Sequence, residues 1–243
     1  MKKKILSGIV SLMMAVSCVS PVLAADKASG EIKNIIYMIP DGGGMSPFNL
    51  ADALKQAGGW DRNVYPNSTV TEQSEMYLKQ YLVGAITTHS ANAEVTDSAA
   101  AGTALSSGYK TNNGYIGMTP DKIPQANILE AAQYVGKNVG LVTTCEWANA
   151  TPAAFAAHEK DRGNYAPMSE QMVNQGLEVV LSSGFGAAKW GDISEAEIRG
   201  YDIIETREDL EAIKPGDKVW GNVVDGTLPY DIESSGQTLQ AQS

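Results

Sequence analysis

The alternation of short apolar runs with helix-forming segments constrains the fold of this chain most. Residues 32–39 are rich in β-formers and almost continuously apolar, and the run stops at Pro40-Asp41-Gly42-Gly43-Gly44. This pattern predicts a buried strand that ends in a tight turn. Residues 139–144 repeat it and again end in a polar cluster. Strands that alternate with helices predict an α/β fold with a mostly parallel sheet flanked by helices.

The remaining elements follow from the same reading of local pattern. We expect further strands at residues 81–88 and 177–181, and helices at residues 45–57, 98–106, 125–134, 152–162 (at its start) and 168–175. Residues 58–75 and 107–124 are predicted loops, and short helices and loops are expected beyond residue 184, with a polar stretch at 225–243. Ligands of parallel sheets bind outside the carboxyl ends of the strands. Asp41 and Asn149-Ala150-Thr151 lie near such ends.

The first 24 residues have the pattern of a secretory signal peptide. A basic start, Met1-Lys2-Lys3-Lys4, precedes a short apolar stretch at residues 5–16 and a small-residue cleavage site, Val22-Leu23-Ala24. The apolar stretch is too short for a membrane-spanning helix. We therefore expect a domain of residues 25–243 and a secreted or periplasmic location. A lipoprotein anchored at Cys18 is the less favoured alternative, because Ala15 stands where a leucine is expected.

The charge of the chain excludes one class of partner. The signal segment holds three of the 18 basic residues and none of the 28 acidic ones, which leaves 15 against 28 and a formal charge of −13. A chain of this charge does not attract nucleic acid through its overall field. An anionic substrate has to be drawn by a local positive site, such as metal ions. Cys145 is the one cysteine after the signal segment, so residues 25–243 form no internal disulfide.

The stretch Asp97-Ser98-Ala99-Ala100-Ala101-Gly102-Thr103 carries the most information about chemistry. A serine follows an acid and opens a run of small residues, which favours a helix and allows another group to approach closely. On the pattern alone, Asp97 or Ser98 caps this helix. Alternatively, Ser98 is a nucleophile at a helix N-terminus, where backbone N–H groups and the macrodipole favour an alkoxide or a bound phosphate.

Other polar residues each have a structural and a functional interpretation. Asp41 is a turn residue or a ligand of a hard divalent cation. Thr151 caps the next helix or ligates Mg²⁺, and Arg162 is a surface charge or a two-pronged clamp on phosphate oxygens. His89 and His158 are favoured as structural residues. The chain has no phosphate loop of the Gly-x-x-x-x-Gly-Lys type, no Gly-x-Ser-x-Gly, and no Cys or His cluster for a structural zinc.

Taken together, three motifs resemble the alkaline phosphatase family. Val95-Thr96-Asp97-Ser98-Ala99-Ala100-Ala101-Gly102-Thr103 is close to the family's nucleophile signature, and residues 34–44 resemble its first metal-binding strand. Ala148-Asn149-Ala150-Thr151-Pro152-Ala153-Ala154, followed by His158 and Arg162, is similar to the segment with the Mg²⁺ hydroxyl ligand and the phosphate-binding arginine. The motifs occur in the family's order.

The resemblance implies hydrolysis of phosphate monoesters within a three-layer α/β sandwich. Ser98 would be the nucleophile, forming a phosphoserine, and Arg162 would hold two phosphate oxygens. Two Zn²⁺ and one Mg²⁺ are implied: Asp41 would bridge a Zn²⁺ and the Mg²⁺, Thr151 would ligate Mg²⁺, and Ser98 would ligate zinc. A homodimer is implied for an intact form. Asn149 stands where the family often has Asp or His, which leaves the metal preference of the third site open.

The family's remaining metal ligands have no counterpart in this chain, in which no histidine follows His158. We therefore expect the N-terminal portion of a catalytic domain, incomplete at its C-terminal side and with little or no activity alone. One alternative is a non-catalytic phosphate-binding protein that keeps Ser98 and Arg162. Another is a related phosphodiesterase, sulfatase or phosphomutase, although the Cys/Ser-x-Pro-x-Arg setting of a sulfatase is missing around Ser98.

Overall fold

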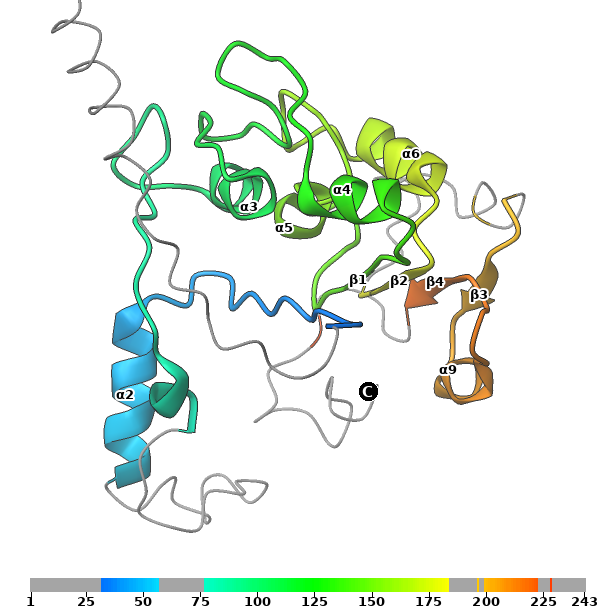
Figure 1. Cartoon of the computed structure of the whole chain (residues 1–243), viewed down its shortest axis with the longest axis horizontal. Helices are drawn as coiled ribbons and strands as arrows, with labels where there is room; N and C mark the ends of the chain where they lie inside the picture. Colours follow the sequence, from blue (N-terminus) through cyan, green and yellow to red (C-terminus); the bar gives the residue numbers. More distant parts are fainter. Residues whose placement is uncertain (1–31, 57–76, 184–195, 197–198, 223–227, 229–243) are drawn as a thin grey trace, which may run out of the picture. The chain divides into compact units, whose positions relative to one another are not determined.

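The structure is a computed structural model that describes residues 32–56, 77–183, 196, 199–222 and 228 (Figure 1). The chain divides into two units, Met1–Ile39 and Pro40–Ser243, and every helix and strand named below belongs to the second. The expected signal segment, the loop at 58–75 and, apart from Leu228, the polar stretch at 225–243 lie outside the described residues. No helix in the described ranges has both the length and the apolar character that crossing a membrane requires.

Among the described residues, a four-stranded parallel sheet forms the centre of the second unit. Its strands are β1 (Gly140–Val142), β2 (Val179–Ser182), β3 (Asp202–Ile204) and β4 (Val219–Asn222), in the order β1-β2-β4-β3. Val180 lies opposite Leu141 on one side and Trp220 on the other, and Trp220 is paired in turn with Ile203. The α/β fold with a parallel sheet, expected from the alternation of elements, is confirmed.

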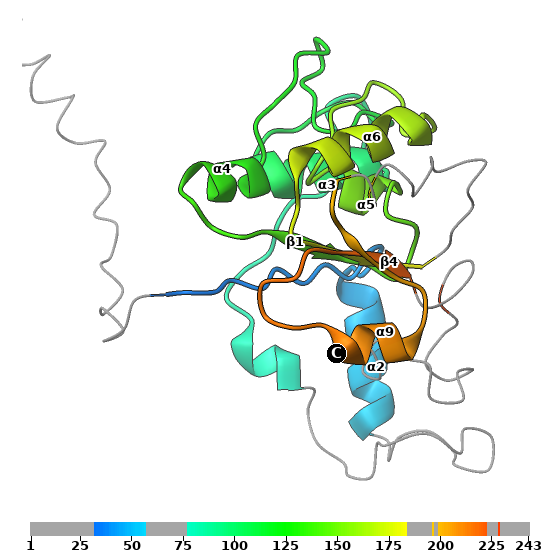
Figure 2. The same cartoon turned by 90° about the vertical axis from the view of Figure 1, so that its right-hand side faces the viewer.

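Helices cover both faces of this sheet. Figure 2 shows α3 (Ser98–Ser107), α4 (Ile128–Tyr134), α5 (Ala150–Ala153) and α6 (Tyr165–Gln175) on one face, and α9 (Arg207–Ala212) on the other. Two further elements precede them: the helix α2 (Met45–Gln56) and the 3₁₀ helix η1 (Tyr77–Tyr81), which are joined by an ion pair between Asp52 and Lys79.

Most predicted helices are confirmed, with boundaries set by capping side chains. The helix expected at 125–134 begins at Ile128 because Asn127 caps it: Asn127 Oδ1 accepts from the N–H of Glu130 at 3.1 Å, and the Glu130 carboxylate accepts from the N–H of Asn127 at 2.9 Å. The helix expected from Pro152 begins earlier, at Ala150, and ends after a single turn.

The core lies between the sheet and the helices α3, α5 and α6. Trp220 is 1% exposed and packs edge-on against Trp147 and Tyr201, with ring centroids 6.0 and 5.5 Å away. Trp147 Nε1 donates to Ser169 Oγ at 2.8 Å, and the Tyr201 hydroxyl donates to the carbonyl oxygen of Leu177 at 2.7 Å. These buried rings therefore place their polar atoms on partners within the core.

The small residues of α3 allow it to pack closely against α5. A Cβ atom on Gly102 would lie 2.9 Å from Ala154 Cβ and 3.5 Å from Thr151 Cα. Contacts between carbon atoms are optimal at about 3.5–4.0 Å, so only glycine fits this position without displacing α5. The packing fixes α5 beside the helix that begins with Ser98.

Two strand predictions are wrong in the described residues, and two strands were not predicted. Residues 32–39 form no strand, and Ile35 and Ile36 are 78% and 87% exposed. Residues 81–88 form no strand either, because Tyr81 ends η1 and residues 82–88 are irregular. By contrast, β3 and β4 occur where short helices and loops were expected. A strand exists only where a neighbour accepts its backbone hydrogen bonds, and apolar composition does not supply that neighbour. β3 and β4 contain Asp202, Gly221 and Asn222, which weakens their local strand signal.

Candidate functional site

Asp97, and not Ser98, caps α3, and the candidate site lies at the N-terminus of this helix. Asp97 Oδ1 accepts from the N–H of Ala100 at 2.9 Å, and Ser98 is the first residue of α3. The hydroxyl of Ser98 is therefore not consumed by capping. The N–H groups of Ser98 and Ala99 precede the first intrahelical hydrogen bond, so they point out of the helix beside this hydroxyl. Such an N-terminus favours an anion.

Arg162 is brought to Ser98 from 64 positions further along the chain. Arg162 Nη1 donates to Ser98 Oγ at 3.3 Å and lies 3.2 Å from Asp97 Oδ2. The side chains of Arg162 and Asp97 are 36% and 25% exposed, so solvent and small solutes reach them. The arrangement puts a hydroxyl, a guanidinium and a helix N-terminus together, which can bind an oxyanion.

Asp41 and Thr151 form the second group of the site. Thr151 Oγ1 donates to Asp41 Oδ2 at 2.7 Å. Thr151 does not cap α5, because that role belongs to Asn149, whose Oδ1 accepts from the N–H of Ala150 at 2.7 Å. The Thr151 hydroxyl is therefore free to face the Asp41 carboxylate, and two oxygen donors lie side by side.

A packing contact links the helix of the first group to the backbone of the second. Ser98 and Gly102 are four residues apart on α3 and therefore lie on the same side of it. A Cβ atom on Gly102 would lie 3.5 Å from Thr151 Cα, so this side of α3 packs against α5. The structure thus brings the four residues singled out in the sequence together as two pairs, Ser98 with Arg162 and Asp41 with Thr151.

The donor atoms fit magnesium better than zinc. A carboxylate and a hydroxyl are hard oxygen donors, and Mg²⁺ keeps several waters in addition to such ligands. Zinc sites use nitrogen, sulfur and carboxylate ligands in sets of three or four. In the described part of the chain, no three His, Cys, Asp or Glu side chains are grouped to hold a metal ion.

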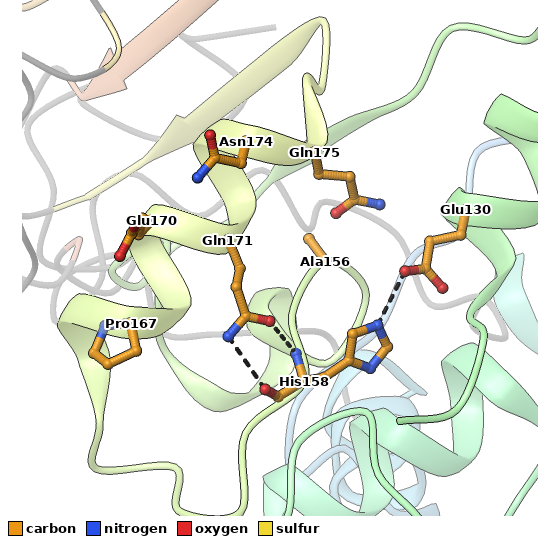
Figure 3. A pocket seen from close by; sticks show the side chains of 8 residues that line it. All are labelled: Glu130, Ala156, His158, Pro167, Glu170, Gln171, Asn174 and Gln175. Carbon is orange, nitrogen blue, oxygen red and sulfur yellow. Dashed lines mark hydrogen bonds and ion pairs between the residues drawn. The ribbon is translucent and has the colours of Figure 1, made fainter. Parts of the chain in front are cut away.

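In the described residues, neither histidine is hydrogen-bonded to these donors. His89 is exposed. His158 Nδ1 lies 2.6 Å from the carbonyl oxygen of Gly117, and its Nε2 lies 3.0 Å from Glu130 Oε1. Figure 3 shows His158 beside Gln171 in the pocket between α4 and α6. Its ring therefore joins two elements of the fold, as expected for a structural histidine.

Cys145 is partly buried just after β1, and no sequence motif indicated its environment. Burial raises the pKa of the Cys145 thiol, and the neighbouring carboxylates of Glu146 and Asp41 raise this pKa further, against a hydrogen bond with Thr143 that lowers it. The thiol is therefore kept neutral over a wider pH range than a free cysteine. Sequence reasoning also passed over Gly114, whose N–H donates to Asp97 Oδ2 at 2.9 Å.

The known proteins that this chain resembles in sequence and in fold are alkaline phosphatases. The family model described as alkaline phosphatase matches residues 32–181. Alkaline phosphatase 3 of Bacillus subtilis is 35% identical, over 94% of this chain and 50% of its own length. The crystal structure of a cold-active alkaline phosphatase from a Shewanella species has a TM-score of 0.71 at 29% identity, covering 84% of this chain and 49% of that one.

A third relative was solved with a metal ion. A variant of the alkaline phosphatase of TAB5, with Mg bound in its M3 site, has a TM-score of 0.51 at 28% identity and covers 59% of this chain and 43% of its own. The chain spans about half the length of the curated relatives it matches.

Proposed function

This chain belongs to the alkaline phosphatase family, and on that premise we propose that it binds phosphate monoesters and supplies Ser98 as the nucleophile for their hydrolysis. We expect little or no turnover by this chain alone, because the described residues contain no group of three His, Cys, Asp or Glu side chains that could hold a zinc ion. The observation that carries the proposal is the contact between Arg162 Nη1 and Ser98 Oγ at 3.3 Å, at the N-terminus of α3. A nucleophile and an anion-binding guanidinium meet there in a position that solvent reaches.

Ser98 acts as the nucleophile in this proposal. Its Oγ attacks the phosphorus atom, and a P–O bond to Ser98 forms while the bond to the departing alcohol oxygen breaks. The hydroxyl proton ends on the alcohol. Water then cleaves the phosphoserine, returns a proton to Ser98 and releases inorganic phosphate. The two steps replace one difficult displacement by two easier ones.

Arg162 binds the phosphoryl group that is transferred. Its guanidinium holds two non-bridging oxygens, and the outward N–H groups of Ser98 and Ala99 add further donors. Because phosphoryl transfer depends mainly on positioning and charge stabilisation, fixed donors of this kind lower the barrier. Asp97 supports this role by holding Nη1 of Arg162 at 3.2 Å.

We infer that Asp41 and Thr151 hold the Mg²⁺ of the site. The adjacent carboxylate and hydroxyl oxygens support this inference, as does the Mg bound by the TAB5 relative. When bound, the ion supplies positive charge that offsets negative charge on the phosphoryl oxygens. Asn149 Oδ1 accepts from the N–H of Ala150 and caps α5, so this oxygen is already engaged in a hydrogen bond.

The two zinc ions implied by the family resemblance do not fit the donors in the described residues. Asp41 and Ser98 are the zinc ligands that the motif comparison assigns, and a group of three His, Cys, Asp or Glu side chains is absent from the part of the chain that the structure describes.

Export and assembly rest on sequence alone. We propose that the segment of residues 1–24 directs a domain of residues 25–243 out of the cytoplasm, to a secreted or periplasmic location, and that an intact form is a homodimer.

A second candidate function is phosphate binding without turnover. The pairing of Ser98 with Arg162 favours it, because this pair can hold an oxyanion without zinc ligands.

Turnover and binding assays separate the two functions. Hydrolysis of p-nitrophenyl phosphate with added Mg²⁺ and Zn²⁺ is measured alongside calorimetry with inorganic phosphate. Ser98→Ala abolishes turnover if Ser98 is the nucleophile, whereas Ser107→Ala, at the other end of α3, leaves turnover unchanged. Phosphate binding without turnover supports the second function. Turnover that survives in Ser98→Ala contradicts the assignment of Ser98.

A further inference from the structure

The short segment 112–118 is bonded to the backbone that carries Arg162. Ile116 and Glu159 exchange both of their N–H···O bonds, at 2.8 and 2.9 Å, and the N–H of Arg162 donates to the carbonyl oxygen of Gly114 at 2.9 Å. The backbone of Arg162 is therefore fixed to Gly114.

The same segment holds the residues that precede α3. The N–H of Gly114 donates to Asp97 Oδ2 at 2.9 Å. Asn113 Oδ1 accepts from the N–H of Asp97 at 3.1 Å, and Asn113 Nδ2 donates to the carbonyl oxygen of Val95 at 3.0 Å. Both ends of the Asn113 amide are thus used to fix the turn that leads into Ser98.

A tight turn presents Asn113 for these contacts. The N–H of Tyr115 donates to the carbonyl oxygen of Asn112 at 3.1 Å, which closes a four-residue turn with Asn113 and Gly114 at its centre. Gly114 has a φ of 86°, which glycine adopts without the strain that a side chain would add. One turn therefore faces Asp97 with a side chain and Arg162 with a backbone carbonyl.

We propose that Asn113 is a positioning residue for the pair Ser98 and Arg162. Asp97 is the link, since it precedes Ser98 in the chain and accepts from Arg162 Nη1. Asn113 holds the backbone of Asp97, so loss of its amide lets the Asp97 carboxylate and the guanidinium bonded to it move relative to Ser98. Asn113 itself does not contact the phosphate. The inference rests on the proposed function in that the pair it positions is the phosphate site.

Phosphate affinity of the full chain tests this role. Asn113→Ala is compared with Asn112→Ala, the same change at a neighbouring position that serves the turn through its backbone oxygen. A hydrogen bond contributes about 0.5–1.5 kcal/mol net, so Asn113→Ala weakens phosphate binding by roughly threefold to tenfold in calorimetry. Asn112→Ala changes it by less than about twofold.

The NMR signal of the Arg162 Nε–Hε group gives a readout that requires no ligand. The signal is assigned by its disappearance in Arg162→Lys, and spectra are recorded where unfolding curves show each variant to be folded. Asn113→Ala shifts or broadens this signal and Asn112→Ala leaves it unchanged. Asn113→Ser, which keeps a small polar side chain, is used in the same comparison if the alanine variant does not fold.

The outcomes separate the two proposals. If Asn113→Ala lowers stability but leaves the Arg162 signal as it is in Asn112→Ala, Asn113 is structural only and the inference is overturned. If the unmodified chain binds no phosphate, the proposed function fails. The positioning role is then judged on the Arg162 signal alone, and an unchanged signal overturns it too.

Discussion

The substitution Gly102→Ala tests whether close packing against α5 fixes α3, the helix that begins with Ser98. The new methyl of Gly102→Ala would lie 2.9 Å from Ala154 Cβ, so α3 and α5 have to separate by about half an ångström or more. Overpacking of this kind costs about 1–3 kcal/mol. The higher helix propensity of alanine offsets about 1 kcal/mol of that cost. We expect Gly102→Ala to lower the free energy of unfolding by up to about 2 kcal/mol.

A double-mutant cycle isolates the contact from the propensity effect. Ala154→Gly alone destabilises by about 1–2 kcal/mol, through a lost buried methyl and a more flexible backbone. In the double variant the clash is absent, so Gly102→Ala becomes neutral or stabilising. The two changes should therefore deviate from additivity by about 1–3 kcal/mol in the favourable direction.

Urea unfolding measures each free energy, with fluorescence of the buried Trp147 and Trp220 as the signal. Ala153→Gly is the control, because Ala153 is equally buried on α5 but is not among the atoms nearest to the new methyl. Its coupling to Gly102→Ala should be near zero. If Ala154→Gly and Gly102→Ala add to within about 0.5 kcal/mol, the close approach does not hold α3 against α5 and the reasoning is refuted.

Three further changes have defined outcomes. Asp97→Ala removes the cap of α3 and should lower the free energy of unfolding by about 0.5–2 kcal/mol. It should also weaken phosphate binding, since the Arg162 guanidinium loses the carboxylate that accepts its hydrogen bond. An unchanged phosphate affinity in calorimetry would show that Asp97 does not support Arg162. Trp147→Phe keeps an aromatic ring in the core but leaves Ser169 Oγ without its indole donor, so urea unfolding should report a loss of about 1–3 kcal/mol. Because burial raises the pKa of the Cys145 thiol, the thiolate forms only at higher pH. Iodoacetamide should therefore label native Cys145 more slowly than the urea-unfolded chain at pH 8, with the native rate rising as pH increases further; equal rates would contradict the raised pKa.

Helix α3 could be predicted from the sequence because its capping residue and its helix-forming residues are neighbours in the chain. A run of small helix formers follows Asp97, a residue type that caps helices, and α3 begins at Ser98 as expected. The choice between Asp97 and Ser98 as the cap was open in the sequence. It was decided by geometry, since Asp97 Oδ1 lies 2.9 Å from the N–H of Ala100.

The strands could be predicted less well, because their partners lie far away in sequence. Residues 32–39 have strong strand composition and form no strand in the described residues, while β3 and β4 pair despite a weak local pattern. A ladder depends on which backbone lies alongside. That neighbour is set by the packing of the whole unit, and a local pattern does not encode it.

The residue types of the site and their order can be identified from the sequence: an acid after a strand-like run, a serine that opens a small-residue helix, a threonine before a proline, and an arginine further on. Which of these residues contact one another depends on how the chain packs. Thr151 faces Asp41 because Asn149 caps α5 in its place, and Arg162 reaches Ser98 because the turn at Asn113 and Gly114 holds Asp97 beside the arginine backbone. Contacts across this sequence separation depend on packing such as that at Gly102, where the absence of one methyl group lets two helices touch.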